Sequence, residues 1–121
     1  MTIINITKPI VSLAQTDRGN SGTATITLDV SVATKQKLTI TGTTTIAYSN
    51  WPASGTYGEI ELMLVNGASS TVTWPTVSWL KGDGTNSTTF STMGVTLYSS
   101  GTNFVIVWST DGGTTLYGRA A

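Results

Sequence analysis

A strict two-residue alternation over residues 58–65 is the feature that most limits what this chain can fold into. Ile60, Leu62 and Leu64 fall on one side of the alternation, whereas the other side carries two glutamates. Successive side chains of a β-strand point to opposite faces of the sheet, so this period predicts a strand with one face in the core. Residues 23–30 show the same period, and the chain is therefore expected to be built from strands.

Further short segments alternate in the same way, at residues 37–41, 44–49, 95–97 and 104–108. Residues 72–79 are expected to form a bent strand broken by Pro75, and a second hairpin is expected to reach Leu116 and Tyr117. Turn signals lie between them, at Asn66-Gly67 and at residues 111–113, where the residue types tolerate a positive φ. Threonine is abundant and fits a pleated surface, whereas helix signals are almost absent. Eight to nine short strands at this spacing predict an all-β fold, namely an antiparallel, jelly-roll-like β-sandwich over residues 23–121.

The first 22 residues differ from the rest of the chain, because they are strongly apolar and are interrupted by Pro9. Their large apolar side chains are those of Ile3, Ile4, Ile6, Ile10, Val11 and Leu13. Left in water, such a segment would expose a hydrophobic edge that is prone to pairing. Residues 1–22 are therefore expected to form an extended N-terminal arm that docks on a neighbouring subunit or on another protein.

Composition argues against several classes of partner. A length of 121 residues suits one domain with a single core. Six basic and six acidic residues cancel and are scattered, so no nucleic-acid-binding patch is expected. No apolar run approaches the length of a membrane helix, so no membrane partner is expected either. The chain has no cysteine, which leaves its redox compartment open.

Catalytic chemistry has little to build on in this sequence. There is no histidine, which removes the usual general base and most zinc sites. Glu59 and Glu61 lie on one face of one strand, roughly 6.6 Å apart along it, and same-strand neighbours would flank a bond from one side only. Asp83 and Asn86 supply two oxygen ligands for a cation, but a plain Gly-Asp turn is the simpler interpretation. The chain is therefore expected to be no enzyme, with no cofactor and no metal.

Aromatic residues are the remaining candidates for ligand binding. Trp74 and Trp108 fall in apolar alternating segments and are expected in the core. Trp51 lies in a loop before a proline, and Trp79 precedes a Gly-Asp-Gly turn, so these two are expected nearer the surface together with Tyr57. Flat aromatic faces stack on sugars, but aromatic residues also gather at the centres of subunit interfaces. Both interpretations stay open for Trp51, Tyr57 and Trp79.

Two motifs, "TVTWP" at residues 71–75 and "DGGTTLYG" at residues 111–118, resemble a domain that recurs in tail fibres and other virion proteins of tailed bacteriophages. Together with the Asn, Pro and Gly residues of the segment before them, the resemblance covers residues 32–119. It implies a β-sandwich in which the Trp74-Pro75 unit forms a corner, and it carries no catalytic residue. Leu116 stands where the family has an aromatic residue.

The resemblance, combined with the apolar arm, leads to an expected function. The chain is expected to be a capsid decoration or cement protein, made in the bacterial cytoplasm and located on the capsid surface of the virion. Its expected partners are further copies of itself, as a homotrimer, and the major capsid protein of the phage head. The alternative is a short tail-fibre or tail-tip adhesin that binds a host surface glycan through Trp51, Tyr57 and Trp79.

Overall fold

A computed structural model of the chain describes residues 14–121, and within them nearly all regular structure is β. The ten strands are β1 (Gln15–Asn20), β2 (Thr25–Asp29), β3 (Lys35–Thr39), β4 (Thr44–Ser49), β5 (Gly58–Val65), β6 (Val72–Thr73), β7 (Ser78–Leu80), β8 (Asn86–Ser87), β9 (Thr102–Ser109) and β10 (Tyr117–Ala120). A single 3₁₀ turn, η1 (Phe90–Met93), lies between β8 and β9. The mostly-β composition confirms what the alternation predicted, and no strand forms at residues 95–97.

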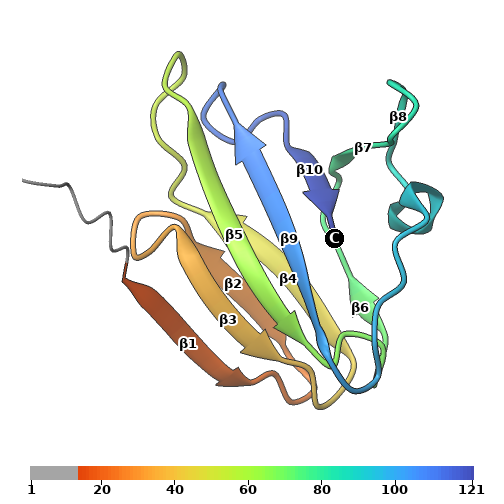
Figure 1. Cartoon of the computed structure of the whole chain (residues 1–121). Helices are drawn as coiled ribbons and strands as arrows, with labels where there is room; N and C mark the ends of the chain where they lie inside the picture. Colours follow the sequence, from red (N-terminus) through yellow and green to blue (C-terminus); the bar gives the residue numbers. More distant parts are fainter. Residues whose placement is uncertain (1–13) are drawn as a thin grey trace, which may run out of the picture.

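The strands form two sheets that lie face to face. Sheet A has seven strands in the order β1-β3-β5-β9-β10-β7-β8, and sheet B has three in the order β2-β4-β6. As far as β6 the chain alternates between the sheets, and Figure 1 shows β2 and β4 behind β3 and β5. Within each sheet these strands pair in parallel with their neighbours. In sheet A, β1 pairs with β3 and β3 with β5, and in sheet B, β2 pairs with β4 and β4 with β6. Each passage through the facing sheet is the crossover that parallel neighbours require.

The expected antiparallel, jelly-roll-like pairing was wrong for this first half of the chain. Antiparallel pairs do occur in the second half, between β5 and β9, β9 and β10, and β7 and β8. Short connections suggested hairpins, in which consecutive strands lie side by side. A short connection also joins two strands that face each other across the core, and alternation of side chains is the same in both arrangements.

Buried polar side chains hold the successive crossovers together. Gln36 is buried on β3, and its amide nitrogen donates to the carbonyl oxygens of Asp29 at 2.8 Å and Ala33 at 3.0 Å. At the opposite end, the buried hydroxyl of Thr44 lies 2.7 Å from the hydroxyl oxygen of Ser21. Because buried polar groups are costly unless they are paired, these contacts help to fix the connections between the two sheets.

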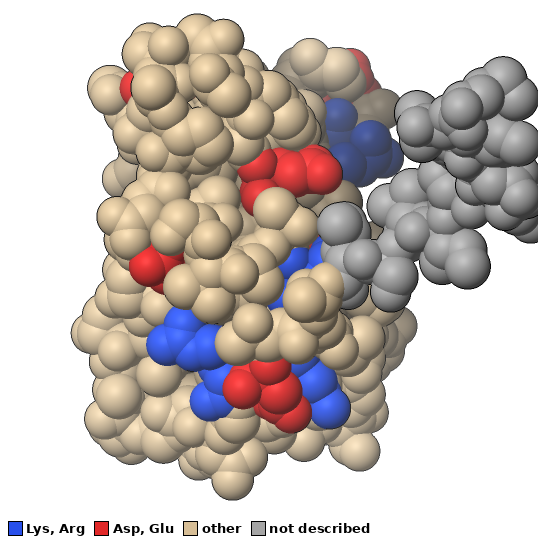
Figure 2. Space-filling view, turned by 90° about the vertical axis from the view of Figure 1, so that its left-hand side faces the viewer, with Lys and Arg blue, Asp and Glu red and all other residues tan. Residues whose placement is uncertain are grey.

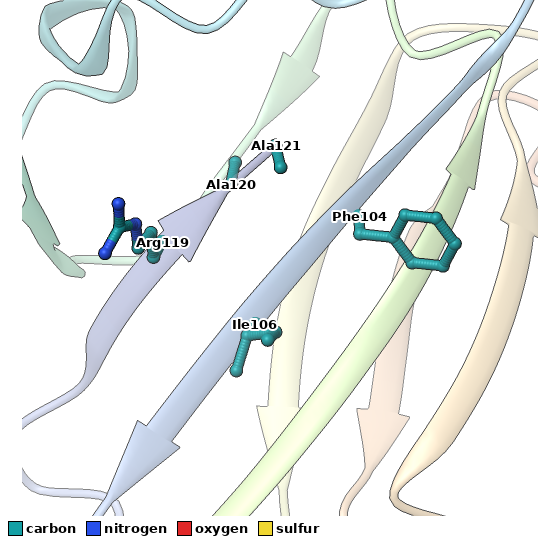
Figure 3. Close-up of a pocket in the computed structure, with 5 residues that line it drawn as sticks. All are labelled: Phe104, Ile106, Arg119, Ala120 and Ala121. Atoms are coloured by element: carbon teal, nitrogen blue, oxygen red, sulfur yellow. The ribbon is translucent and has the colours of Figure 1, made fainter.

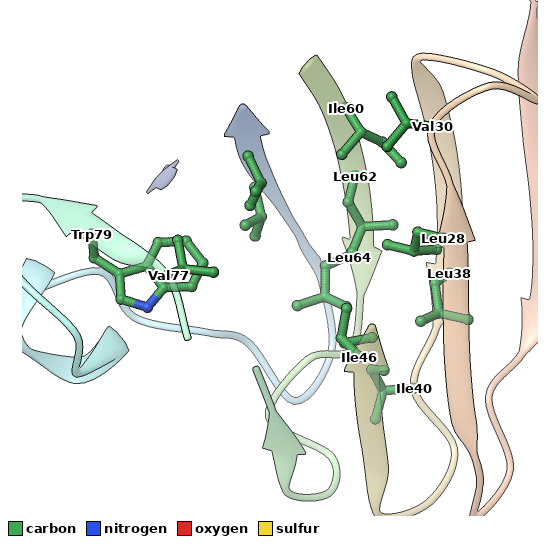
Figure 4. Close-up of a cluster of buried hydrophobic side chains, with 12 residues drawn as sticks. Leu28, Val30, Leu38, Ile40, Ile46, Ile60, Leu62, Leu64, Val77 and Trp79 are labelled. Carbon is green, nitrogen blue, oxygen red and sulfur yellow. The ribbon is translucent and has the colours of Figure 1, made fainter. Parts of the chain in front are cut away.

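One hydrophobic core lies between the sheets. Its buried residues are Leu28, Val30, Leu38, Ile40, Ile46, Ile60, Leu62, Leu64, Val77, Trp79, Val105 and Val107. Figure 4 shows side chains of β5 meeting those of the strands beside and behind it, with Val77 and Trp79 at one end of the cluster. The alternating face of residues 58–65 is thus the centre of the core, as the sequence predicted.

The folded body begins before Thr23. Residues 15–20 fall within the segment expected as an arm, yet they form β1, which pairs with β3 at the edge of sheet A. Arg18 links this edge strand to the facing sheet by donating to the carbonyl oxygen of Thr27 at 2.7 Å. The arm side chains Ile3, Ile4, Ile6, Ile10, Val11 and Leu13 lie outside the described residues.

Asp111 organises the turn from β9 to β10. Its carboxylate accepts hydrogen bonds from the backbone N–H of Thr115 at 2.9 Å and from the hydroxyl of Ser109 at 2.8 Å. Gly112 and Gly113 follow with φ of 72° and 89°, as the turn signal predicted. The hydrogen bonds, that of the Thr115 backbone first, lower the pKa of Asp111 below its ordinary value.

Acid should destabilise the fold partly through this carboxylate. Because the pKa of Asp111 is lower in the folded chain, its contribution is fully present above the unfolded pKa and is lost as pH falls through the folded value. Melting temperatures measured from about pH 6 down to about pH 2 should therefore fall less steeply for Asp111→Asn than for the wild type below about pH 4. Parallel profiles for the two proteins would contradict this role.

Candidate partner-binding face

The side of sheet A that faces away from sheet B carries an unusual concentration of large side chains. On β5 and β9 every second residue is buried in the core, so the residues between them point outward. We call the resulting surface the outer face; it comprises Lys35, Lys37, Glu59, Glu61, Met63, Phe104, Ile106, Trp108, Tyr117 and Arg119. All of these residues are at least partly accessible to solvent.

Strand register arranges the outer face in rows that run across the sheet. Glu61 on β5 pairs with Ile106 on β9, which pairs with Arg119 on β10. This row therefore has a carboxylate on one side, an apolar residue in the middle and a guanidinium on the other side. Lys35 on β3 extends the row and forms an ion pair with Glu61.

The two neighbouring rows repeat the apolar centre. In one of them Glu59, Trp108 and Tyr117 lie side by side on β5, β9 and β10. The rings of Trp108 and Tyr117 stack with their centres 6.1 Å apart. In the other row Met63 pairs with Phe104. The middle strand of the outer face is thus apolar along three successive outward positions.

Phe104 is the most exposed of these apolar side chains, with 42% of its surface accessible. It lines a shallow hollow together with Ile106, Arg119 and the last two alanines of the chain. Figure 3 shows the ring of Phe104 extending over β5, while Arg119 projects from β10 on the other side of Ile106. Exposed apolar surface framed by charge is typical of protein contact sites.

Charged residues elsewhere on the molecule are sparse. Figure 2 shows acidic and basic side chains next to one another on one side of the molecule, with wide neutral areas around them. Asp17 on β1 lies beside Lys37 on β3, so opposite charges also neighbour each other towards the edge of sheet A. Over the described part of the chain, residues 14–121, such alternation of sign offers no surface of one charge for a polyanion.

Trp79 and Trp108 have exchanged the places expected for them. Trp79, expected near the surface, is 1% exposed and packs edge-on against the rings of Trp74 at 5.4 Å and Phe90 at 4.9 Å. Trp108, expected in the core, is half-buried on the outer face. Pro75 separates β6 in sheet B from β7 in sheet A, which lets Trp74 and Trp79 approach the same aromatic cluster from two sheets.

The two other aromatic candidates lie in the loop region before β5. Trp51 is half-buried, and its ring lies 5.9 Å from that of Tyr48. Tyr57 is 56% exposed, and its hydroxyl donates to Glu59 at 3.0 Å. Partial burial, followed by this acidic partner, raises the pKa of Tyr57 above its ordinary value. Of the three aromatic residues singled out from the sequence, only Tyr57 is therefore more than half exposed.

Acidic residues of the described chain are engaged in local contacts. Glu59 accepts from Tyr57, Glu61 pairs with Lys35, and Asp83 accepts from the backbone and hydroxyl of Thr85 at 3.0 Å and 2.6 Å. The last arrangement is a turn in which an Asp side chain caps the backbone two residues on. Within residues 14–121 no three acidic side chains gather as a metal site would require.

Comparisons with known proteins add no relative: no family model, no curated protein and no solved structure matches this chain. No helix among residues 14–121 is long and apolar enough to cross a membrane. The outer face, with its exposed apolar residues and flanking charges, is consequently the candidate partner-binding surface of this protein.

Proposed function

We propose that this chain is a structural protein of a tailed-bacteriophage particle, most specifically a decoration or cement protein on the outside of the head. The outer face is the observation that carries this proposal. It combines three apolar positions on β9 with flanking charges, which is the composition of a protein contact surface. The resemblance of the motifs "TVTWP" and "DGGTTLYG" to those of phage virion proteins supports the same proposal.

Attachment to the head is assigned to the edge of sheet A that β1 forms. Among residues 14–121 this strand has a neighbour on one side only, so its remaining backbone groups are a template for another strand. The apolar residues 1–13 directly precede it in the sequence. We assign this edge and the residues before it to contacts with the major capsid protein.

Stabilisation would follow from mass action. A protein that binds the assembled shell and not the dissociated subunits shifts the equilibrium towards the shell. Many copies acting together convert weak individual contacts into a large total effect. Such a role needs no catalytic group. It is compatible with a chain in which the acidic residues described above take part in turns and ion pairs.

A tail adhesin that binds host glycan is the second candidate, and Tyr57 is the observation in its favour. The residue is 56% exposed, and aromatic rings stack on sugars. The candidate is weaker than the first, because Trp79 is enclosed in the core and cannot offer its face to a sugar.

Electron microscopy of purified virions labelled with antibody-gold against this chain tests the location. Label over the head is expected, and label confined to the tail tip would favour the adhesin instead. Added to heads that lack it, the wild-type chain should co-sediment and raise the temperature at which shells break.

A full-length variant with Ile6→Asp and Ile10→Asp should lose this co-sedimentation. Thr45→Asp is the matched control, because Thr45 is exposed on the outward side of sheet B, away from β1. Equal binding by the two variants would contradict the assignment of the N-terminal contact.

A further inference from the structure

The charged and polar residues of the outer face are arranged so that the face is complementary to itself. In the row Glu61–Ile106–Arg119, opposite charges lie on the two sides of a central apolar residue. In the row Glu59–Trp108–Tyr117, a hydrogen-bond acceptor and a donor likewise lie on the two sides of a tryptophan. Both rows thus place the carboxylate on β5 and the donor on β10, and β9 lies between these two strands.

We propose that the outer face binds the outer face of a second copy of this chain, related by a two-fold axis that runs along β9. Such an axis places β10 of each copy over β5 of the other, because the rotation exchanges the strands on the two sides of β9. Arg119 of one copy then meets Glu61 of the second copy, and the same contact forms again on the other side. This proposal names the partner of the face and holds whether or not the protein decorates a phage head.

The same two-fold rotation also brings complementary groups of the other rows together. Tyr117 meets Glu59 of the second copy, so a phenol hydroxyl faces a carboxylate acceptor. Along the axis Ile106 and Trp108 meet their own counterparts, which buries the apolar middle strand against itself. Phe104, 42% exposed in the single chain, lies on the same strand and is covered with them.

Energetics favour this occupant over a chemically unrelated one. Two sheets pack face to face about 10 Å apart with their strands nearly aligned, and a two-fold axis along a strand produces that alignment. Apolar anchors at the centre of an interface supply most of the binding energy, while charge pairs at its rim set orientation and specificity. In a three-fold arrangement, by contrast, each contact joins two different patches of the surface. The opposite charges on β5 and β10 would then not pair with each other across the contact.

Charge exchange across the interface gives a direct test. Arg119→Glu would set two carboxylates against each other at both symmetric contacts, and Glu61→Arg would set two guanidinium groups against each other. Each variant alone should therefore pair at least about tenfold more weakly than the wild type, since like charges across an interface oppose binding. An equimolar mixture of the two variants should pair again, because both contacts then join opposite charges.

Sedimentation velocity and native mass spectrometry of the full chain, without shells, measure these states. Thr45→Glu is the matched control and should pair like the wild type, since Thr45 lies on the outward side of sheet B. Circular dichroism checks that every variant is folded. Recovery of mixed pairs that contain one copy of each variant would support the two-fold contact.

Several results would overturn the proposal. They are a wild-type chain that stays monomeric at about 1 mM, where even weak pairs form, a trimer, or a pair that survives Arg119→Glu. Failure of the two folded variants to pair with each other would also overturn it. Binding to phage heads is decided separately by the shell assay, because that assay changes Ile6 and Ile10, which do not belong to the outer face.

Discussion

Trp79→Ala is expected to lower the free energy of unfolding by about 3–5 kcal/mol, the usual cost of truncating a buried tryptophan. Trp79 is 1% exposed and packs edge-on against Trp74 and Phe90, whose rings stack on each other. Its removal leaves a cavity that these neighbours cannot fill without breaking their own stacking contact. Total stability of a domain of this size is commonly about 5–15 kcal/mol, so the variant should be close to unfolding. Urea denaturation followed by tryptophan fluorescence and circular dichroism measures the change.

Trp108→Ala provides the matched control for that experiment. It removes the same side chain from the outer face, where Trp108 is half-buried and stacks on Tyr117 alone. Its cost should be about 1–2 kcal/mol, because less apolar area is withdrawn from water. A larger loss for Trp108→Ala than for Trp79→Ala would contradict the assignment of the core.

Gly118→Ala should destabilise the fold by about 1–3 kcal/mol, although it adds a single methyl group. Gly118 lies on β10, beside Trp79 on β7, and a Cβ atom there would come within 2.6 Å of Cε3 of that ring and 2.8 Å of Cγ1 of Val77. Both neighbours are fully enclosed in the core and have no space to retreat. The backbone of Gly118 has no positive φ, so the cost arises from packing alone.

A double-variant cycle isolates this contact. Trp79→Phe shortens the ring that a Cβ at position 118 would meet, so the two changes together should cost less than the sum of each alone. Gly82→Ala is the control, because no atom lies within 4 Å of a Cβ built there. Strict additivity in the cycle would show that Trp79 and Gly118 do not limit each other.

Local features of this fold follow closely from the sequence. The predicted strands at residues 44–49 and 58–65 coincide with β4 and β5, because strong alternation requires one face in the core. Asn66 has a φ of 57°, as its turn signal predicted, and the glycines after Asp111 likewise adopt positive φ. These properties depend on neighbouring residues only, which is why a single sequence is enough to find them.

The position of the candidate site could not be found in this way. On β9 both alternating sets are apolar, since Val105 and Val107 fall on one face and Ile106 and Trp108 on the other. Periodicity therefore cannot say which set is buried. Pairing with β5 decides it, because Val105 and Val107 lie beside the core residues Leu62 and Ile60. Trp108 was consequently expected in the core, and the outer face was missed.

The sequence by itself determined that the chain forms short strands, where most of them lie and which turns join them, because these depend on the order of apolar and polar side chains. Tertiary structure alone decided whether consecutive strands lie side by side or face each other across the core. It also decided which of two apolar faces is exposed, and it brought Glu61, Ile106 and Arg119 into one row. The reason is that strand pairing joins residues far apart in the chain, and each pairing is selected by the fit of whole faces.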